Sequence, residues 1–280
     1  MGFSRRSFFQ QVAASAAVIR PLSAKSAGFK VGVTDWNLHL SGKVEAVAFA
    51  RKLGFEGVEV SLGRTPVENR LPLDNADLQS QYRAAAKEHG IALAGTCLDI
   101  LHVNYLRNDK LALKWVADGI EITKKLNAKV MLLPFFGKGA LSTREEQDYV
   151  GDALKELAPA AHKAGVLLGL EDTISAQDNV HIMERSQSPA VKVYYDVGNS
   201  TNGGFPIVQE MAWLGKQRIC QIHLKDKGYL GEGSIDFPAV IKTIESIGFR
   251  GFANLETSSP SKSIENDMAR NLAFVRKLMA

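Results

Sequence analysis

Apolar and polar positions along the chain follow two patterns that alternate. One consists of short runs of apolar, β-branched and aromatic residues, which is typical of strands buried on both faces. The other spaces apolar residues three and four positions apart and predicts amphipathic helices. The strands are expected at residues 30–36, 57–62, 91–98, 129–136, 166–172, 191–199, 219–226 and 251–256. The helices are expected at residues 43–53, 74–89, 109–127, 144–163, 176–187, 205–216, 237–247 and 264–279.

The returns from helix to strand are short and pass through a glycine at Gly54, Gly90, Gly165 and Gly248. Repeated β–α units of this kind predict parallel strands. About eight units that close on themselves form a (β/α)8 TIM barrel, a single-domain α/β fold of ~250 residues. The competing fold is an open doubly wound sheet, but its strand count is lower and no GxGxxG or Walker-type loop follows the first expected strand. We therefore expect one barrel domain over residues 28–280.

Residues 1–27 have the layout of a twin-arginine export signal. Paired arginines at positions 5 and 6 precede two phenylalanines, a short apolar stretch over 12–19 and a small-residue segment that ends near Ala27. This pattern predicts an exported, periplasmic protein, and the alternative is a frayed amphipathic helix. The apolar stretch is too short to span a bilayer and no later segment is longer, so we expect no stable membrane anchor.

The overall charge comes from this N-terminal segment. The chain has 34 basic and 30 acidic residues, and four of the basic residues but none of the acidic ones lie within positions 1–26, which leaves 30 of each in the remainder. A neutral domain lacks the basic surface of a nucleic-acid-binding protein, so no nucleic-acid partner is expected. The two cysteines, Cys97 and Cys220, lie in expected strands and are interpreted as buried small hydrophobic residues.

Four of the expected strands carry a metal-binding side chain near their C-terminal end: Glu171, Asp196, His223 and Glu256. In a TIM barrel these ends meet on the face that holds the active site. A buried carboxylate costs several kcal/mol unless it is neutralised, and one divalent cation would neutralise the whole set. Three carboxylates and one imidazole suit Mn²⁺ best, with Mg²⁺, Co²⁺ or Zn²⁺ as alternatives. The other interpretation is that each carboxylate forms a separate structural ion pair.

Sequence motifs surround these residues: LED at 170–172, YYDVGN at 194–199, HLKD at 223–226, GEGSIDF at 231–237 and NLE at 254–256. With these motifs, residues 30–280 resemble the xylose isomerase-like superfamily, specifically its sugar phosphate isomerase/epimerase family. The resemblance implies that Glu171, Asp196, His223 and Glu256 hold one divalent cation. It also implies that Glu171 and Glu256 are the catalytic acid–base pair.

The chemistry that suits this set is proton removal next to a ketone. Such a step needs a positioned base and stabilisation of the developing enolate oxygen. Two carboxylates on opposite sides of a planar cis-enediolate would take a proton from one face and return one to the other, which is epimerisation. If the same intermediate expelled a β-hydroxyl, the enzyme would be a keto-sugar dehydratase or lyase.

Two further alternatives use the same barrel. A barrel that binds sugar without reaction would not need the pair Glu171 and Glu256. An apurinic endonuclease would continue the strand of Asp196 into a further histidine, whereas Gly198 and Asn199 follow here. The expected partner is therefore a small sugar or keto-sugar, unphosphorylated if the protein is exported, and further copies of the chain if it forms a homo-oligomer.

Six residues are expected to contact the substrate: Trp36, Glu59, His102, Asn199, Lys225 and Lys227. Each has an alternative role. Lys225 would otherwise be a partner of Glu256 or Asp196, and Glu59 a partner of a catalytic side chain or part of a salt bridge. His102 would be a capped loop residue and Trp36 ordinary rim packing. Lys227 stands where related proteins carry an arginine, but lysine lacks the bidentate guanidinium.

Overall fold

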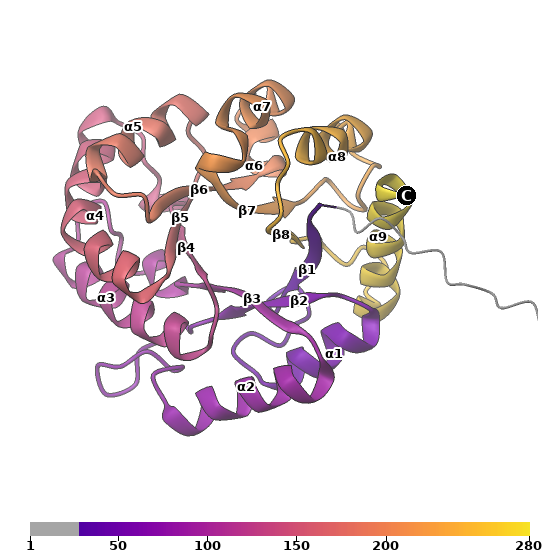
Figure 1. Ribbon diagram of the computed structural model, residues 1–280, viewed down its shortest axis with the longest axis horizontal. Helices are drawn as coiled ribbons and strands as arrows, with labels where there is room; N and C mark the ends of the chain where they lie inside the picture. The colour runs from indigo at the N-terminus through magenta and orange to yellow at the C-terminus, as the bar shows by residue number, and fades with distance from the viewer. Residues whose placement is uncertain (1–27) are drawn as a thin grey trace, which may run out of the picture.

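Eight parallel strands form a closed barrel in chain order, with β1 paired to β8, in a computed structural model that describes residues 28–280. The strands are β1 (Lys30–Thr34), β2 (Gly57–Ser61), β3 (Ala92–Cys97), β4 (Val130–Pro134), β5 (Leu167–Glu171), β6 (Val191–Asp196), β7 (Ile219–Leu224) and β8 (Phe252–Leu255). Helices surround the barrel (Figure 1). The expected single (β/α)8 TIM barrel is confirmed, and the expected export signal lies outside the described residues.

The eight expected helices are all present, each close to its expected bounds. They are α1 (Glu45–Leu53), α2 (Ala76–His89), α3 (Lys110–Lys125), α4 (Arg144–Ala164), α5 (Ala176–Ser186), α7 (Ile207–Arg218), α8 (Phe237–Ser246) and α9 (Ile264–Met279). Three short helices were not expected: η1 (Asp99–His102), η2 (Gly137–Gly139) and α6 (Val197–Asn202). In the part of the chain described here, no helix combines the length and the apolar character needed to cross a membrane.

Local sequence signals explain where the helices begin and end. Thr143 and Glu146 form a capping box at the start of α4. The glycines at the helix-to-strand returns adopt the left-handed conformation that ends a helix, with φ of 97° at Gly54, 60° at Gly90 and 71° at Gly165.

The expected strand over residues 191–199 is shorter than the apolar pattern indicates. It ends at Asp196, because the Oδ1 atom of Asp196 accepts a hydrogen bond of 2.7 Å from the backbone N–H of Asn199 and caps α6. The Val-Gly-Asn segment therefore turns into a helix at the point where the strand reaches the barrel mouth. This cap also fixes the direction of the Asp196 carboxylate.

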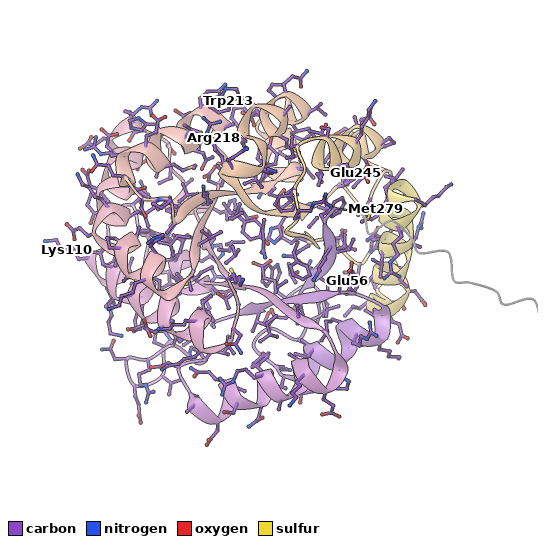
Figure 2. The ribbon with its side chains drawn as sticks, in the orientation of Figure 1. Glu56, Lys110, Trp213, Arg218, Glu245 and Met279 are labelled. Carbon is purple, nitrogen blue, oxygen red and sulfur yellow. The ribbon has the colours of Figure 1, made fainter. Side chains whose placement is uncertain are left out.

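The apolar core lies mainly between the barrel and the helices, where Phe55, Tyr82 and Trp115 are almost fully buried. A smaller cluster that includes Cys97, Tyr194 and Cys220 fills the barrel itself. Side chains occupy the interior in the view along the barrel axis, whereas large exposed residues such as Trp213 lie on the outer helices (Figure 2). Both cysteines are free and buried, which confirms the sequence interpretation.

Close packing inside the barrel requires a glycine at position 32. A Cβ atom there would overlap the side-chain oxygen of Asn254 in β8 and lie 3.2 Å from the carbonyl oxygen of Gly57. We expect Gly32→Ala to lower the free energy of unfolding by ~1–3 kcal/mol, because the added methyl group overpacks this layer. Urea denaturation followed by circular dichroism measures the change.

A double-mutant cycle identifies the cause of this penalty. In an Asn254→Ala background the clash with the side-chain amide is absent, so the penalty of Gly32→Ala should be smaller. An equal penalty in both backgrounds would show that Asn254 is not the residue that excludes the methyl group.

Candidate metal centre and active site

Four side chains converge at the C-terminal ends of β5 to β8. Glu171 and Asp196 are the last residues of β5 and β6, His223 is the penultimate residue of β7, and Glu256 directly follows β8. Strand pairing places Asp196 beside His223, which explains why residues far apart in sequence meet. One ligand atom from each of the four residues lies within 4.8 Å of the others.

This arrangement fits a divalent cation. Ligand atoms on opposite sides of such an ion lie up to ~4.4 Å apart, twice a metal–ligand distance of about 2.0–2.2 Å. In the structure, His223 Nδ1 lies 2.8 Å from Glu171 Oε1, 3.7 Å from Glu256 Oε2 and 3.8 Å from Asp196 Oδ2. Small side-chain movements would therefore place all four atoms around one ion.

The electrostatic environment separates the two expected catalytic carboxylates. Burial raises the pKa of Glu171 to about 8, although the neighbouring His223 opposes the rise. Burial would also raise the pKa of Glu256, but the positive charges of His223 and Lys225 outweigh it and lower that pKa to about 2. Two carboxyl groups whose pKa values are pushed apart in this way are suited to acid and base roles.

Two side chains hold Glu256 in place. The Lys225 ammonium lies 2.5 Å from Glu256 Oε2 and donates to it, and the Trp36 Nε1–H donates to Glu256 Oε1 over 3.0 Å. Lys225 also lies 3.5 Å from Asp196 Oδ2 and 3.4 Å from Asn199 Oδ1. Lys225 is thus a partner of two candidate metal ligands, which is the alternative role considered for it. It also lines the pocket.

Glu59 lies below this cluster and does not line the pocket, contrary to its expected place beside the substrate. Its side chain is completely buried in β2, and its Oε2 atom accepts from the Tyr194 hydroxyl over 2.6 Å and from Asn254 Nδ2 over 3.0 Å. The same oxygen lies 3.0 Å from His223 Nε2. A carboxylate in this position orients the imidazole so that its Nδ1 atom faces the other candidate ligands.

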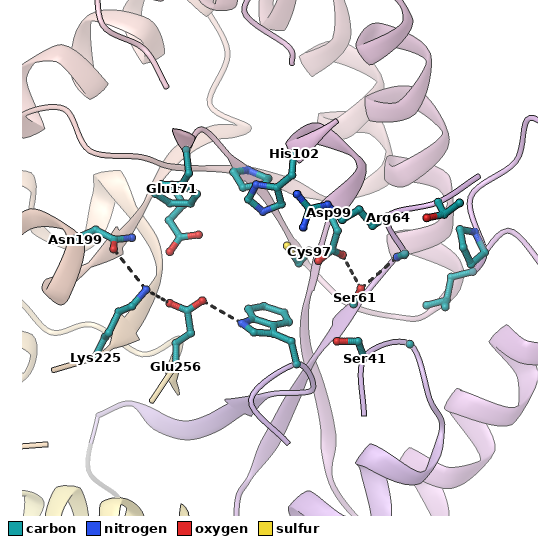
Figure 3. Close-up of a pocket in the computed structure, with 18 residues that line it drawn as sticks. Ser41, Ser61, Arg64, Cys97, Asp99, His102, Glu171, Asn199, Lys225 and Glu256 are labelled. Carbon is teal, nitrogen blue, oxygen red and sulfur yellow. Dashed lines mark hydrogen bonds and ion pairs between the residues drawn. The ribbon is translucent and has the colours of Figure 1, made fainter. Parts of the chain in front are cut away.

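A pocket of about 730 Å³ opens above the cluster (Figure 3). Of the six expected substrate residues, Trp36, His102, Asn199 and Lys225 line it. Lys227 does not: it is exposed and lines a neighbouring cavity of about 530 Å³, which shares Lys225 with the main pocket.

Several residues of the site were missed at the sequence level. Tyr194 and Asn254 stand inside the quoted motifs, but nothing in the sequence shows that they meet Glu59. Arg64 lines the pocket from the loop after β2 and Asp99 from the first position of η1, and neither segment has a periodic pattern in the sequence.

The sequence matches a family model over most of its length. The model of the family described as xylose isomerase-like TIM barrel matches residues 47–278. The chain belongs to the xylose isomerase-like TIM barrel family.

Relatives with similar sequences include two named epimerases. The chain is 26% identical over 265 residues to the L-ribulose-5-phosphate 3-epimerase of Escherichia coli, which covers 85% of this chain and 90% of that protein. It is 26% identical over 204 residues to the 2-epi-5-epi-valiolone 7-phosphate 2-epimerase of Actinoplanes sp., which covers 70% of this chain and 72% of that protein.

Solved structures share the fold. The D-psicose 3-epimerase of Clostridium cellulolyticum H10 superposes with a TM-score of 0.75 at 16% identity and covers 90% of this chain and 99% of that one. The 3-keto-D-glucoside 4-epimerase of E. coli superposes with a TM-score of 0.70 at 16% identity and covers 89% of this chain and 99% of that one.

Two substitutions at Asp196 separate its two roles. Asp196→Asn keeps an oxygen that accepts from Asn199 but removes the charge, so affinity for Mn²⁺ should fall by more than the ~10–100-fold typical of residues outside the ligand shell.

Asp196→Ala also removes the cap of α6 and should be less stable than Asp196→Asn by ~1 kcal/mol. Isothermal titration with Mn²⁺ and urea denaturation in chelator measure the two effects. Mn²⁺ binding by Asp196→Asn at wild-type strength would remove Asp196 from the ligand set.

Substitution of Glu59 tests the buried contact with His223. Glu59→Gln should lower Mn²⁺ affinity by ~10–100-fold, because the imidazole loses its carboxylate partner. The matched control is Glu245→Gln on the exposed surface of α8, which should bind Mn²⁺ like the wild type. Equal affinity in both variants would show that Glu59 does not orient the ligand.

Proposed function

We propose that the protein is a metal-dependent sugar isomerase/epimerase that acts on a carbon next to a ketone. The observation that carries the proposal is the pair Glu171 and Glu256, whose carboxylates face one another where the four candidate metal ligands meet (Figure 3). The names of the two epimerases with similar sequences support the same reaction class.

The residues of the chain would divide the reaction between them. Glu256, held ionised by Lys225 and Trp36, would accept the proton from the carbon on its side of the substrate. Glu171, which faces Glu256 across the site, would return a proton on the other side (Figure 3). A divalent cation held by Glu171, Asp196, His223 and Glu256 would supply positive charge beside the ketone oxygen.

The finer assignments are part of the same proposal. Mn²⁺ suits the oxygen-rich ligand set best. Residues 1–27 would direct the protein to the periplasm by the twin-arginine route, where unphosphorylated sugars are the available substrates.

Exchange in D₂O tests the reaction. Mn²⁺-loaded protein incubated with D-psicose, L-ribulose or D-fructose should place deuterium on the carbon next to the ketone of at least one of them, without loss of water. Glu171→Gln should slow this exchange by at least ~100-fold, because a positioned acid or base contributes about 10²–10⁴-fold. Mass spectrometry and NMR measure the incorporation.

The exposed variant Glu245→Gln serves as the control and should exchange like the wild type. Release of water with a loss of hydroxyl from the product would instead identify a dehydratase. If protein shown to hold Mn²⁺ exchanged no ketone or keto-glycoside, the epimerase proposal would be wrong.

A further inference from the structure

The pocket extends well beyond the catalytic pair. Its inner end holds Glu171, Glu256 and Lys225, and its lining continues past His102 to Arg64 in the loop after β2 (Figure 3). Its volume of about 730 Å³ falls within the ~300–1,000 Å³ range of sites for drug-sized ligands. A single ketose is smaller than such ligands, so the outer part of the pocket has room for a second group.

We call this outer part the outer subsite and define it by the residues Ser41, Arg64, Pro72, Leu73, Asp99 and His102. Asp99 accepts a hydrogen bond of 2.6 Å from the hydroxyl of Ser61, which fixes its carboxylate. The ring of His102 stacks on Phe136, with 6.2 Å between ring centroids and 25° between planes. The subsite therefore has positioned polar groups as well as an apolar surface at Pro72 and Leu73.

The charges of the outer subsite favour a neutral ligand. The subsite has one basic side chain, Arg64, and one acidic side chain, Asp99, whose pKa is raised by burial. Burial together with the nearby Arg64 lowers the pKa of His102, which keeps its ring neutral at pH 7. A second carboxyl group, the buried Asp35, accepts from the Ser61 N–H over 3.0 Å, and burial raises its pKa well above the usual range. Of the side chains that define the outer subsite, Arg64 is the one with a fixed positive charge, so a phosphate dianion placed here would meet a single guanidinium.

Hydroxyl groups suit the same side chains. They donate to the Asp99 carboxylate and accept from the Arg64 guanidinium, and the imidazole of His102 can do either. The apolar wall of Pro72 and Leu73 matches the C–H face of a sugar ring. These are the properties of a site for a ring with polar edges and apolar faces.

We propose that the outer subsite binds a second, uncharged sugar ring, so that the preferred substrate is a keto-sugar with a glycosidic substituent and not a phosphorylated ketose. This inference rests on the proposed function, because the ketone must reach the catalytic pair at the inner end.

The test uses ligands that share one ketose unit. D-fructose has no substituent, isomaltulose carries a glucosyl ring on O6, lactulose carries a galactosyl ring on O4, and fructose 6-phosphate carries a phosphate on O6. Exchange in D₂O should have a kcat/KM at least ~10-fold higher for isomaltulose or lactulose than for fructose, as a few new hydrogen bonds provide. Fructose 6-phosphate should not exceed fructose.

Arg64→Ala should remove the advantage of the two-ring substrate, so that its kcat/KM falls to that of fructose measured in the same variant. Arg51→Ala, an exposed arginine on α1, is the matched control and should keep the advantage. Exchange of fructose without any gain for either two-ring ketose would overturn the subsite and leave the proposed reaction intact. A preference for fructose 6-phosphate that is lost in Lys227→Ala would also overturn it and place the anion in the neighbouring cavity.

A binding measurement distinguishes failure of the subsite from failure of the reaction. Reduction of isomaltulose gives two epimeric alditols, a glucosyl-sorbitol and a glucosyl-mannitol. The glucosyl-sorbitol has no ketone and cannot react. It should bind Mn²⁺-loaded protein more tightly than sorbitol in isothermal titration, and Arg64→Ala should abolish the difference. This result in a protein that exchanges no ketone would support the subsite and refute the reaction, whereas equal binding of glucosyl-sorbitol and sorbitol would refute the subsite.

Discussion

The structure of the site depends on how three closely spaced carboxylates, two buried and one partly buried, are compensated by positive charge. Glu171, Asp196 and Glu256 lie within a few ångströms of each other, and removal from water makes their charges costly. His223 and Lys225 provide the compensating positive charge within the chain. Both come from β7 or the residue after it, between the strands that carry Asp196 and Glu256. Closure of the barrel is what brings the compensating groups and the acids to one place.

The fold and the four candidate ligands could be predicted because both depend on local patterns. Buried parallel strands have continuous apolar runs, and a charged residue that ends such a run lies at the barrel mouth. How deep a side chain lies within the barrel could not be predicted from such patterns. Glu59 lies in the middle of its apolar run, and the pairing of β2 with β3 shifts register between Val58 and Glu59. Its side chain is completely buried below the candidate ligands. No pattern in β2 alone contains that shift.

The positions of side chains in the loops after the strands could not be predicted either, because these loops have no periodic pattern. Lys227 follows β7 closely, but Asp226 accepts from the backbone N–H groups of Lys227, Gly231 and Gly233 and turns the loop toward the neighbouring cavity. Arg64 enters the pocket from the loop after β2, and Asp99 from the short helix η1 after β3. The barrel thus has one side, β5 to β8, that presents the reactive groups and another side, the loops after β1 to β3, that shapes the outer pocket. Only the first side has a strong sequence pattern.

The cap of α6 has a consequence for how a cation would be held. One oxygen of the Asp196 carboxylate accepts a hydrogen bond from the backbone N–H of Asn199, which leaves the other oxygen free to coordinate a cation. A monodentate carboxylate fills one coordination position of a metal ion, whereas a bidentate carboxylate fills two. If a cation is held here, the position that Asp196 leaves open would be available to an oxygen from outside the protein. The six-residue helix α6 would thereby influence how many hydroxyl groups of a substrate could bind the ion.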